Sequence, residues 1–94
     1  NVPEIPKGFK SIWAQYTIKV DNREYIQNSL KEKNIPSMVY YPIPMHLQPA
    51  YKKYYRKPLI NSEKLSKVVL SLPMYPDMTE EIQDYIITNL MVIL

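Results

Sequence analysis

The chain contains no cysteine among its 94 residues, and this absence restricts its possible folds more than any other feature. Without disulfides or thiolate-bound zinc, a chain of this size must be stabilised by a single well-filled apolar core. Ordering the chain costs about 1.5 kcal/mol per residue, so its apolar residues have to be buried together. The sequence therefore predicts one domain over residues 1–94 in a reducing compartment, and we expect it to be cytoplasmic.

The scarcity of glycine and histidine excludes several classes of site. Gly8 is the only glycine, whereas P-loops and dinucleotide-binding loops need several glycines so that the backbone can approach phosphates. His46 is the only histidine, so no site can use two imidazoles, and we predict no metal site. The longest apolar stretch, 85–94, is half as long as the ~20 residues of a membrane helix, so we expect no membrane segment.

The first twenty residues predict an irregular lead-in followed by a strand. Residues 1–10 contain two prolines and the glycine without any periodicity. From residue 11 to residue 20, apolar and polar side chains alternate, which is typical of a strand with one buried face. The apolar members of that face are Ile12, Ala14, Tyr16, Ile18 and Val20.

A helix and a second strand are expected next. Asp21 is a suitable N-cap, and apolar residues at helical spacing predict a helix that runs to about Lys33. Asn34 favours a left-handed end, and Pro36 prevents continuation of the helix. The β-prone run 37–41 then predicts the second strand. The buried stripe of the helix consists of Tyr25, Ile26, Ser29 and Leu30.

A stiff loop and a short helix follow. The three prolines within residues 42–49 remove backbone donors, so the loop is expected to be rigid and without regular structure. Residues 50–57 favour a short helix, and Asn61 is expected to cap a longer one. Residues 69–74 could become extended and form a third strand. The stripe of the longer helix consists of Leu65, Val68, Val69 and Leu72.

The last element is predicted to be a helix that begins at Thr79, with acidic residues in its first turn, where the helix dipole favours them. Its expected buried residues are Ile82, Tyr85, Ile86 and Leu90. The tail 91–94 is apolar all round, which indicates a missing partner surface. The whole pattern predicts an α+β fold with a small antiparallel sheet of about three strands and helices packed on one face.

Among the residues that could carry catalytic chemistry, His46 is the main candidate. His46 lies in the proline-stiffened loop, where it is either a ligand-binding group or a histidine bonded to the backbone. A hydrolytic triad is not supported, because a nucleophile elbow needs glycines that the chain lacks. Paired-carboxylate catalysis is not supported either, because the helix dipole explains Glu80, Glu81 and Asp84.

The net charge of +3 is concentrated in the segment 51–57, where Lys52, Lys53, Arg56 and Lys57 alternate with tyrosines. Cations interleaved with aromatic rings are typical of single-stranded nucleic-acid binding. The alternative is a solvated helical turn whose tyrosines pack inward. We therefore keep a free-standing nucleic-acid-binding module as an alternative function, although the acidic balance elsewhere argues against nucleic acid as a partner.

Five segments in a fixed order resemble a known family. They are SIWAQYTI at 11–18, IP at 35–36, YPIPMHLQPAY at 41–51, LSLPMYP at 70–76 and TEE at 79–81. Together they resemble the C-terminal domain of the DegT/DnrJ/EryC1/StrS family of pyridoxal-phosphate-dependent sugar aminotransferases. The resemblance extends from about Ser11 to about Leu90.

The resemblance implies a fold-type I aminotransferase that moves an amino group, usually from glutamate, onto a keto group of a nucleotide-linked sugar. In this family the large N-terminal domain holds pyridoxal phosphate and its lysine. We therefore expect residues 1–94 to be the C-terminal small domain, with no catalytic or cofactor-binding residue of its own and no activity alone. The full-length enzyme is expected to be a homodimer that uses glutamate and a nucleotide sugar.

The resemblance also implies substrate-binding residues in the loop, which lies along one wall of the family's substrate cleft. These are Tyr40, Tyr41, His46 and Gln48, although the family commonly has histidine where this chain has Tyr40. Tyr41 and Leu47 could instead fasten the loop to the core. Family members that act as sugar dehydratases, with histidine in place of the lysine, or that transaminate cyclitols, remain alternatives.

Overall fold

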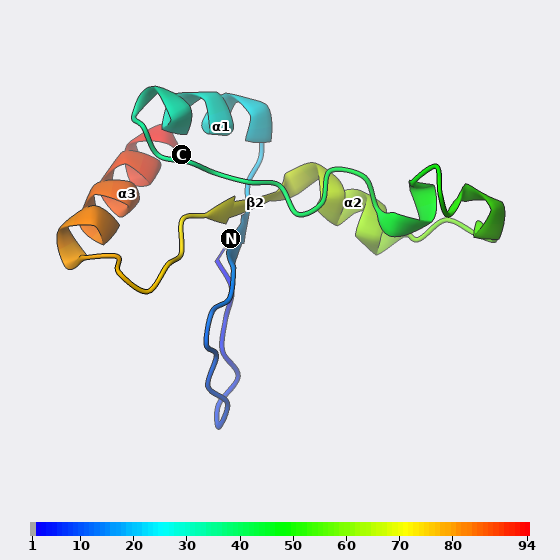
Figure 1. Cartoon of the computed structure of the whole chain (residues 1–94), viewed down its shortest axis with the longest axis horizontal. Coiled ribbons are helices and arrows are strands. Elements are labelled where there is room, and N and C mark those ends of the chain that lie inside the picture. The colour runs from blue at the N-terminus through cyan, green and yellow to red at the C-terminus, as the bar shows by residue number, and fades with distance from the viewer. Residues whose placement is uncertain (1) are drawn as a thin grey trace.

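The computed structural model describes residues 2–94, which form three α-helices, two short strands and two 3-10 turns (Figure 1). In chain order the elements are β1 (Tyr16–Lys19), α1 (Arg23–Glu32), η1 (Met45–Leu47), η2 (Lys52–Tyr54), α2 (Ile60–Val68), β2 (Val69–Leu72) and α3 (Glu80–Ile93). The predicted α+β class is confirmed. Residue 1 of the predicted lead-in lies outside the described residues.

The sheet is antiparallel and pairs β1 with β2, so that Ile18 lies opposite Leu70. On its other face, the hydroxyl oxygens of Thr17 and Ser71 lie 2.8 Å apart and share a hydrogen bond. The predicted strand at 37–41 is wrong, because Met38 forms only an isolated bridge with Ser71. Prolines at positions 36 and 42 lack the backbone donors that would extend this pairing.

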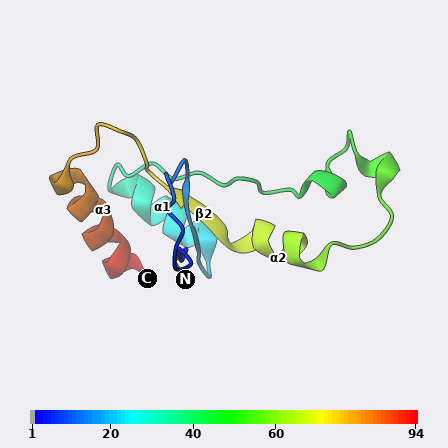
Figure 2. The ribbon, with the colours of Figure 1, turned by 90° about the horizontal axis from the view of Figure 1, so that it is seen from below.

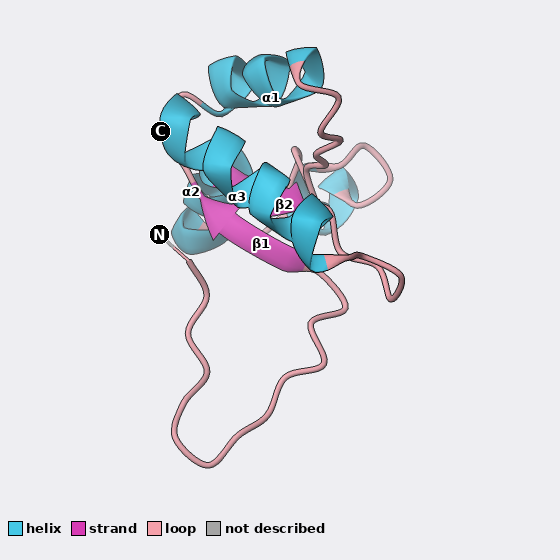
Figure 3. Ribbon diagram, turned by 90° about the vertical axis from the view of Figure 1, so that its left-hand side faces the viewer, coloured by secondary structure: helices cyan, strands magenta, loops and turns pink. Residues whose placement is uncertain are grey.

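One face of the sheet is covered by α1 and α3, as predicted, and Figure 3 shows α3 crossing in front of the strands. The third helix, α2, is an exception: it runs directly into β2, and no apolar residue of it is buried. The buried hydrophobic cluster consists of Ile18, Val20, Ile26, Leu30, Ile35, Leu70, Ile86 and Leu90.

The first strand is shorter than the alternation at 11–20 predicts. Trp13 has a φ of 46°, in the left-handed region, which breaks the extended backbone before β1 begins. Ile12 is therefore 92% exposed, and Ala14 is exposed as well. Only Tyr16, Ile18 and Val20 of the predicted face pack in or against the core, because β2 offers four residues for pairing.

The end of α1 matches the prediction, whereas its start does not. Asn34 adopts a φ of 57°. Its N–H donates a hydrogen bond to the carbonyl oxygen of Lys31, and the N–H of Ile35 donates one to the carbonyl oxygen of Leu30. These two bonds form a Schellman motif, which places Ile35 in the core. At the start, Asn22 rather than Asp21 is the N-cap, and its side chain makes no capping hydrogen bond. Tyr25 of the predicted stripe is exposed.

The segment 40–68, called the arm below, projects away from the rest of the fold (Figures 1 and 2). The sheet, α1 and α3, which enclose the buried hydrophobic cluster, are called the packed part. The structure describes every residue of the arm, and none of its hydrophobic residues is buried. The radius of gyration is 15.5 Å, against the ~12 Å typical of a compact domain of this length. The arm therefore holds its shape without a core of its own.

Within the arm, three predictions of local structure are wrong by about one helical turn each. The loop 42–49 contains the 3-10 turn η1, and the helix expected at 50–57 is reduced to the turn η2. The N-cap of α2 is Leu59 instead of Asn61. Pro58 precedes this cap and favours an extended backbone for the residue before it, which shortens the helices on both sides. Val69 and Leu72 belong to β2, which confirms a strand within the predicted segment 69–74, and not to the predicted helical stripe.

The last helix begins as predicted, because the Thr79 hydroxyl accepts a hydrogen bond of 3.3 Å from the N–H of Ile82. Ile86 and Leu90 are buried, whereas Ile82 and Tyr85 are exposed because α3 meets the core along a narrow stripe. The tail residues Met91, Val92 and Leu94 are exposed. Within residues 2–94, none of the helices has both the length and the apolar character needed to cross a membrane.

Candidate functional site

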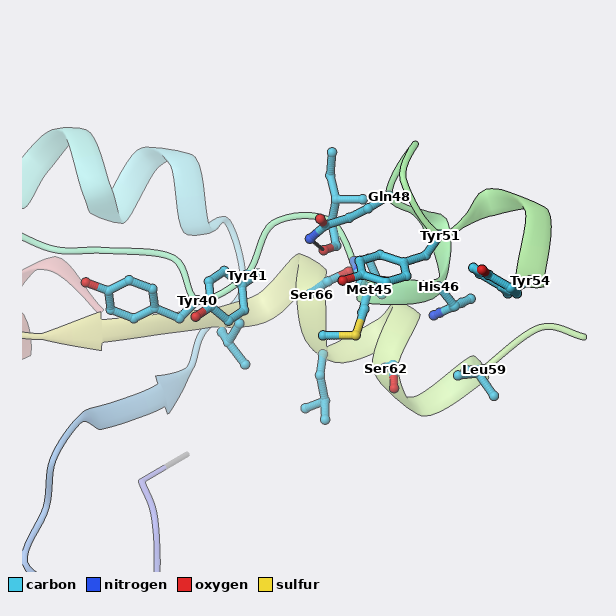
Figure 4. Close-up of a pocket in the computed structure, with 14 residues that line it drawn as sticks. Tyr40, Tyr41, Met45, His46, Gln48, Tyr51, Tyr54, Leu59, Ser62 and Ser66 are labelled. Carbon is cyan, nitrogen blue, oxygen red and sulfur yellow. Dashed lines mark hydrogen bonds between the residues drawn. The ribbon is translucent and has the colours of Figure 1, made fainter. Parts of the chain in front are cut away.

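A pocket of about 730 Å³ lies in the arm between the proline-rich loop and α2 (Figure 4). The loop contributes seven residues between Tyr40 and Gln48, the turn η2 and its flank contribute two tyrosines, and α2 contributes one face. That face carries Ser62 and, one helical turn further on, Leu65 and Ser66. The pocket therefore forms where two segments distant from the core run beside each other.

All four residues predicted to bind substrate line this pocket. The rings of Tyr40 and Tyr41 meet edge to face, with centroids 5.7 Å apart. Tyr41 is 67% exposed and is not part of the core cluster, so it does not fasten the loop to the core. The Gln48 amide nitrogen donates to the Ile43 carbonyl at 3.4 Å and helps to close the loop. The structure brings the four side chains together, and their binding of substrate stays a prediction.

His46 is held from two sides, and only 14% of its side chain is exposed. Its Nε2 lies 3.0 Å from Oε1 of Glu63, and its ring stacks on Tyr55 with centroids 5.9 Å apart. The expectation of a histidine bonded to the backbone is wrong, because its partner is this carboxylate. A carboxylate that accepts from Nε2 favours the tautomer with a proton on that nitrogen, which leaves Nδ1 as an acceptor.

Glu63, which contacts His46, belongs to the candidate site and was missed from the sequence. Its Oε1 also accepts a hydrogen bond of 2.9 Å from the N–H of Leu59 at the start of α2. The hydrogen bond with His46, followed by the one from Leu59, holds the pKa of Glu63 below its ordinary value of 4.5. A signal was present, since Glu63 is the only acidic residue between Glu32 and Asp77. Its partner His46 lies seventeen residues away in the sequence, beyond the range of local patterns.

The tyrosines of segment 51–57 are exposed, so the reading in which they pack inward is wrong. Tyr51 and Tyr54 line the pocket, and Tyr55 stacks on His46. The Lys53 ammonium lies 5.0 Å from the centre of the Tyr54 ring. The segment therefore forms one end of the pocket.

The fold and the pocket define a small α+β domain with a projecting, aromatic-lined arm. The chain belongs to the DegT/DnrJ/EryC1/StrS aminotransferase family, which its sequence matches over residues 1–91. It spans a quarter or less of the length of the curated relatives that it matches.

Solved structures and curated relatives agree with this assignment. A DegT DnrJ EryC1 StrS aminotransferase from Brucella abortus is 46% identical, with a TM-score of 0.90 over 97% of this chain and 25% of that one. NtdA from Bacillus subtilis, solved with its cofactor PMP bound, is 36% identical, with a TM-score of 0.74 over 86% of this chain and 20% of that one. The UDP-2-acetamido-2-deoxy-3-oxo-D-glucuronate aminotransferase of Pseudomonas aeruginosa is 47% identical over 66 residues, which are 70% of this chain and 18% of that protein.

The pocket of this chain does not fit pyridoxal phosphate by itself. Anchoring that cofactor takes a lysine for the Schiff base and a carboxylate for the pyridine nitrogen. None of the fourteen residues that line the pocket is a lysine, an aspartate or a glutamate. Within residues 2–94 there is also no cluster of three or more side chains that could hold a metal ion.

Proposed function

We propose that this chain is the C-terminal small domain of a pyridoxal-phosphate-dependent aminotransferase that moves an amino group from glutamate to a keto sugar linked to a nucleotide. The arm pocket is one wall of the substrate cleft, and Tyr40, Tyr41, His46 and Gln48 contact the sugar nucleotide there. The observation that carries the proposal is the meeting of these four side chains at one pocket, in a chain of an aminotransferase family.

The residues of the wall suit a polyhydroxylated ligand. Tyrosine hydroxyls donate and accept hydrogen bonds, and the Gln48 amide offers two donors and an acceptor oxygen. His46, oriented by Glu63, would present Nδ1 as an acceptor. These groups bind and orient a substrate but supply no anchor for the cofactor, so this chain alone is expected to be inactive.

The cofactor and its lysine would then lie in a large domain outside this chain, and the complete enzyme would work as a cytoplasmic homodimer. Two observations support this division: the chain spans a quarter or less of its relatives, and its pocket contains no lysine. The exposed apolar residues Met91, Val92 and Leu94 at the end of α3 would rest against that domain.

The first test is the visible absorbance of the full-length protein with pyridoxal phosphate, before and after addition of glutamate. An aminotransferase shows a cofactor band that glutamate removes. A band that is indifferent to glutamate would favour the dehydratase branch of the family. No band at all would contradict the proposal and leave a binding module.

The second test concerns the wall. Tyr41→Phe and Gln48→Ala each remove one polar contact, worth roughly 0.5–1.5 kcal/mol, so KM for the keto sugar nucleotide should rise about three- to tenfold. Tyr25→Phe, a change on the exposed side of α1, is the matched control and should leave KM unchanged. Unchanged KM in both pocket variants would refute the role of this wall.

A further inference from the structure

The positive charge of the chain is gathered in the arm. The arm contains six basic residues and one acidic residue, whereas the rest of the chain contains six basic and eight acidic residues. Four of the six cations occur within the segment 52–57, next to the pocket-lining Tyr51. The arm therefore carries a positive field, while the packed part is slightly negative.

Two contacts place part of this charge at the turn η2, beside the pocket-lining Tyr54. The Lys53 ammonium lies over the ring of Tyr54, 5.0 Å from its centre, and Tyr54 lines the pocket. Arg56 turns back toward the same turn, with Nη1 3.4 Å from the carbonyl oxygen of Lys53. Neither contact neutralises a charge, so both cations keep their full attraction for an anion.

No carboxylate offsets the patch. Within residues 2–94, neither Lys52 nor Lys53 forms an ion pair with an acidic side chain. The one carboxylate of the arm, Glu63, is already engaged by His46 and by the N–H of Leu59. The side chains that line the pocket include no lysine, arginine, aspartate or glutamate. The pocket thus has an uncharged lining, and the cationic segment 52–57 adjoins it.

We propose that the four cations of segment 52–57 form a phosphate-recognition rim, which consists of Lys52, Lys53, Arg56 and Lys57. This rim attracts and orients the diphosphate of a nucleotide-linked substrate, while the uncharged wall contacts its sugar. The inference rests on the proposed function and adds a site to it. Lysine binds phosphate as a point charge, and a cationic rim at a cleft raises the local concentration of an anionic substrate. Because the rim is exposed, this attraction is screened by salt.

The geometry favours a nucleoside diphosphate over single-stranded nucleic acid. Nucleic-acid binding of this kind needs free aromatic faces on which successive bases stack. Here the ring of Tyr55 is stacked on His46, and Lys53 lies over the ring of Tyr54. The patch is also only six residues long, which suits a pair of phosphates better than a strand.

The test uses the full-length protein and measures binding of UDP and of uridine by calorimetry at low and high salt. UDP should bind more tightly than uridine, and high salt should lower the affinity for UDP but not the affinity for uridine. In the double variant Lys52→Glu, Lys53→Glu, the affinity for UDP should fall about tenfold or more, with uridine unchanged. The neutral pair Lys52→Gln, Lys53→Gln should give an intermediate loss.

The matched control is Lys7→Glu, Lys10→Glu, which changes the net charge equally at exposed positions of the lead-in. An equal loss of UDP affinity in this control would overturn the proposal, because net charge alone would then explain the effect. Unchanged UDP affinity in the rim variant, or no UDP binding by the unaltered protein, would overturn it as well. So would tight binding of a short oligothymidylate that the rim variant loses.

The same preparations also separate this inference from the proposed function. Removal of the cofactor band by glutamate does not involve the sugar nucleotide, so the rim variant should still show it. A protein whose band responds to glutamate but whose UDP affinity ignores the rim refutes the inference alone. A protein without the glutamate response refutes the proposed function.

Discussion

The packed part and the arm are held together by different physical means. The packed part buries eight hydrophobic residues, and Leu30 and Leu70 in it are completely inaccessible to solvent. The arm buries no hydrophobic residue and is shaped by prolines, two 3-10 turns and the contact between His46 and Glu63. The candidate site is therefore built on the part without a core, where prolines and polar contacts set the geometry.

The largest expected effect comes from replacing one leucine in each part and comparing the loss of stability. Leu30→Ala should lower the free energy of unfolding by about 2–5 kcal/mol, because it leaves a cavity in a fully buried site. Leu65→Ala, at a position 45% exposed in the arm, is the matched change and should cost less than ~1 kcal/mol. Chemical denaturation measures both values. A larger loss for Leu65→Ala would show that the arm belongs to the cooperative core.

A smaller effect is expected at the C-terminal end of α1. Asn34 has a φ of 57°, so Asn34→Ala should destabilise the protein by about 1–2 kcal/mol, as alanine is strained in the left-handed region. Asn34→Gly adopts this conformation without strain and should be neutral within ~0.5 kcal/mol. Thermal unfolding distinguishes the two variants. Equal losses would mean that the Asn34 side chain, rather than its backbone conformation, stabilises the end of α1.

The subtlest prediction concerns the pH response of the arm. The pKa of Glu63 is lowered in the folded protein, so its contribution to stability is complete above 4.5 and is lost as the pH falls through the lowered pKa. Hydrogen exchange of the Leu59 N–H, corrected for the intrinsic rate, should therefore accelerate as the pH falls from ~6 to ~3. The amide of Leu30 in the packed part is the internal reference and should lose less protection.

Glu63→Gln provides the control for this response. Glutamine keeps an acceptor oxygen but carries no titrating charge, so protection of the Leu59 N–H should become independent of pH in this range. A pH response that persists in Glu63→Gln would assign the effect to another group. In that case the contact between His46 and Glu63 would not be what holds the two sides of the pocket together.

The packed part was largely predictable because its signals are local and periodic. The spacing of Ile26 and Leu30, the left-handed stop at Asn34 and the cap at Thr79 each depend on residues within one or two turns, and each is confirmed. The strand predicted from the alternation at 11–20 was too long and included the exposed Ile12. The sequence did not reveal that β2 is too short to pair with a longer strand. The run 37–41 likewise had strand propensity but forms only one bridge, between Met38 and Ser71.

The amino-acid sequence was enough to predict the α+β class, the family and the four loop residues of the candidate site, and to exclude sulfur-based and glycine-rich sites. The tertiary structure was needed to show that these residues meet α2, that Glu63 orients His46, and that Lys53 lies over the ring of the pocket-lining Tyr54. The physical reason is the short sequence separation over which local patterns carry information. Helical and strand periods report on neighbours a few residues apart, whereas this pocket joins segments that have no common period and no shared core.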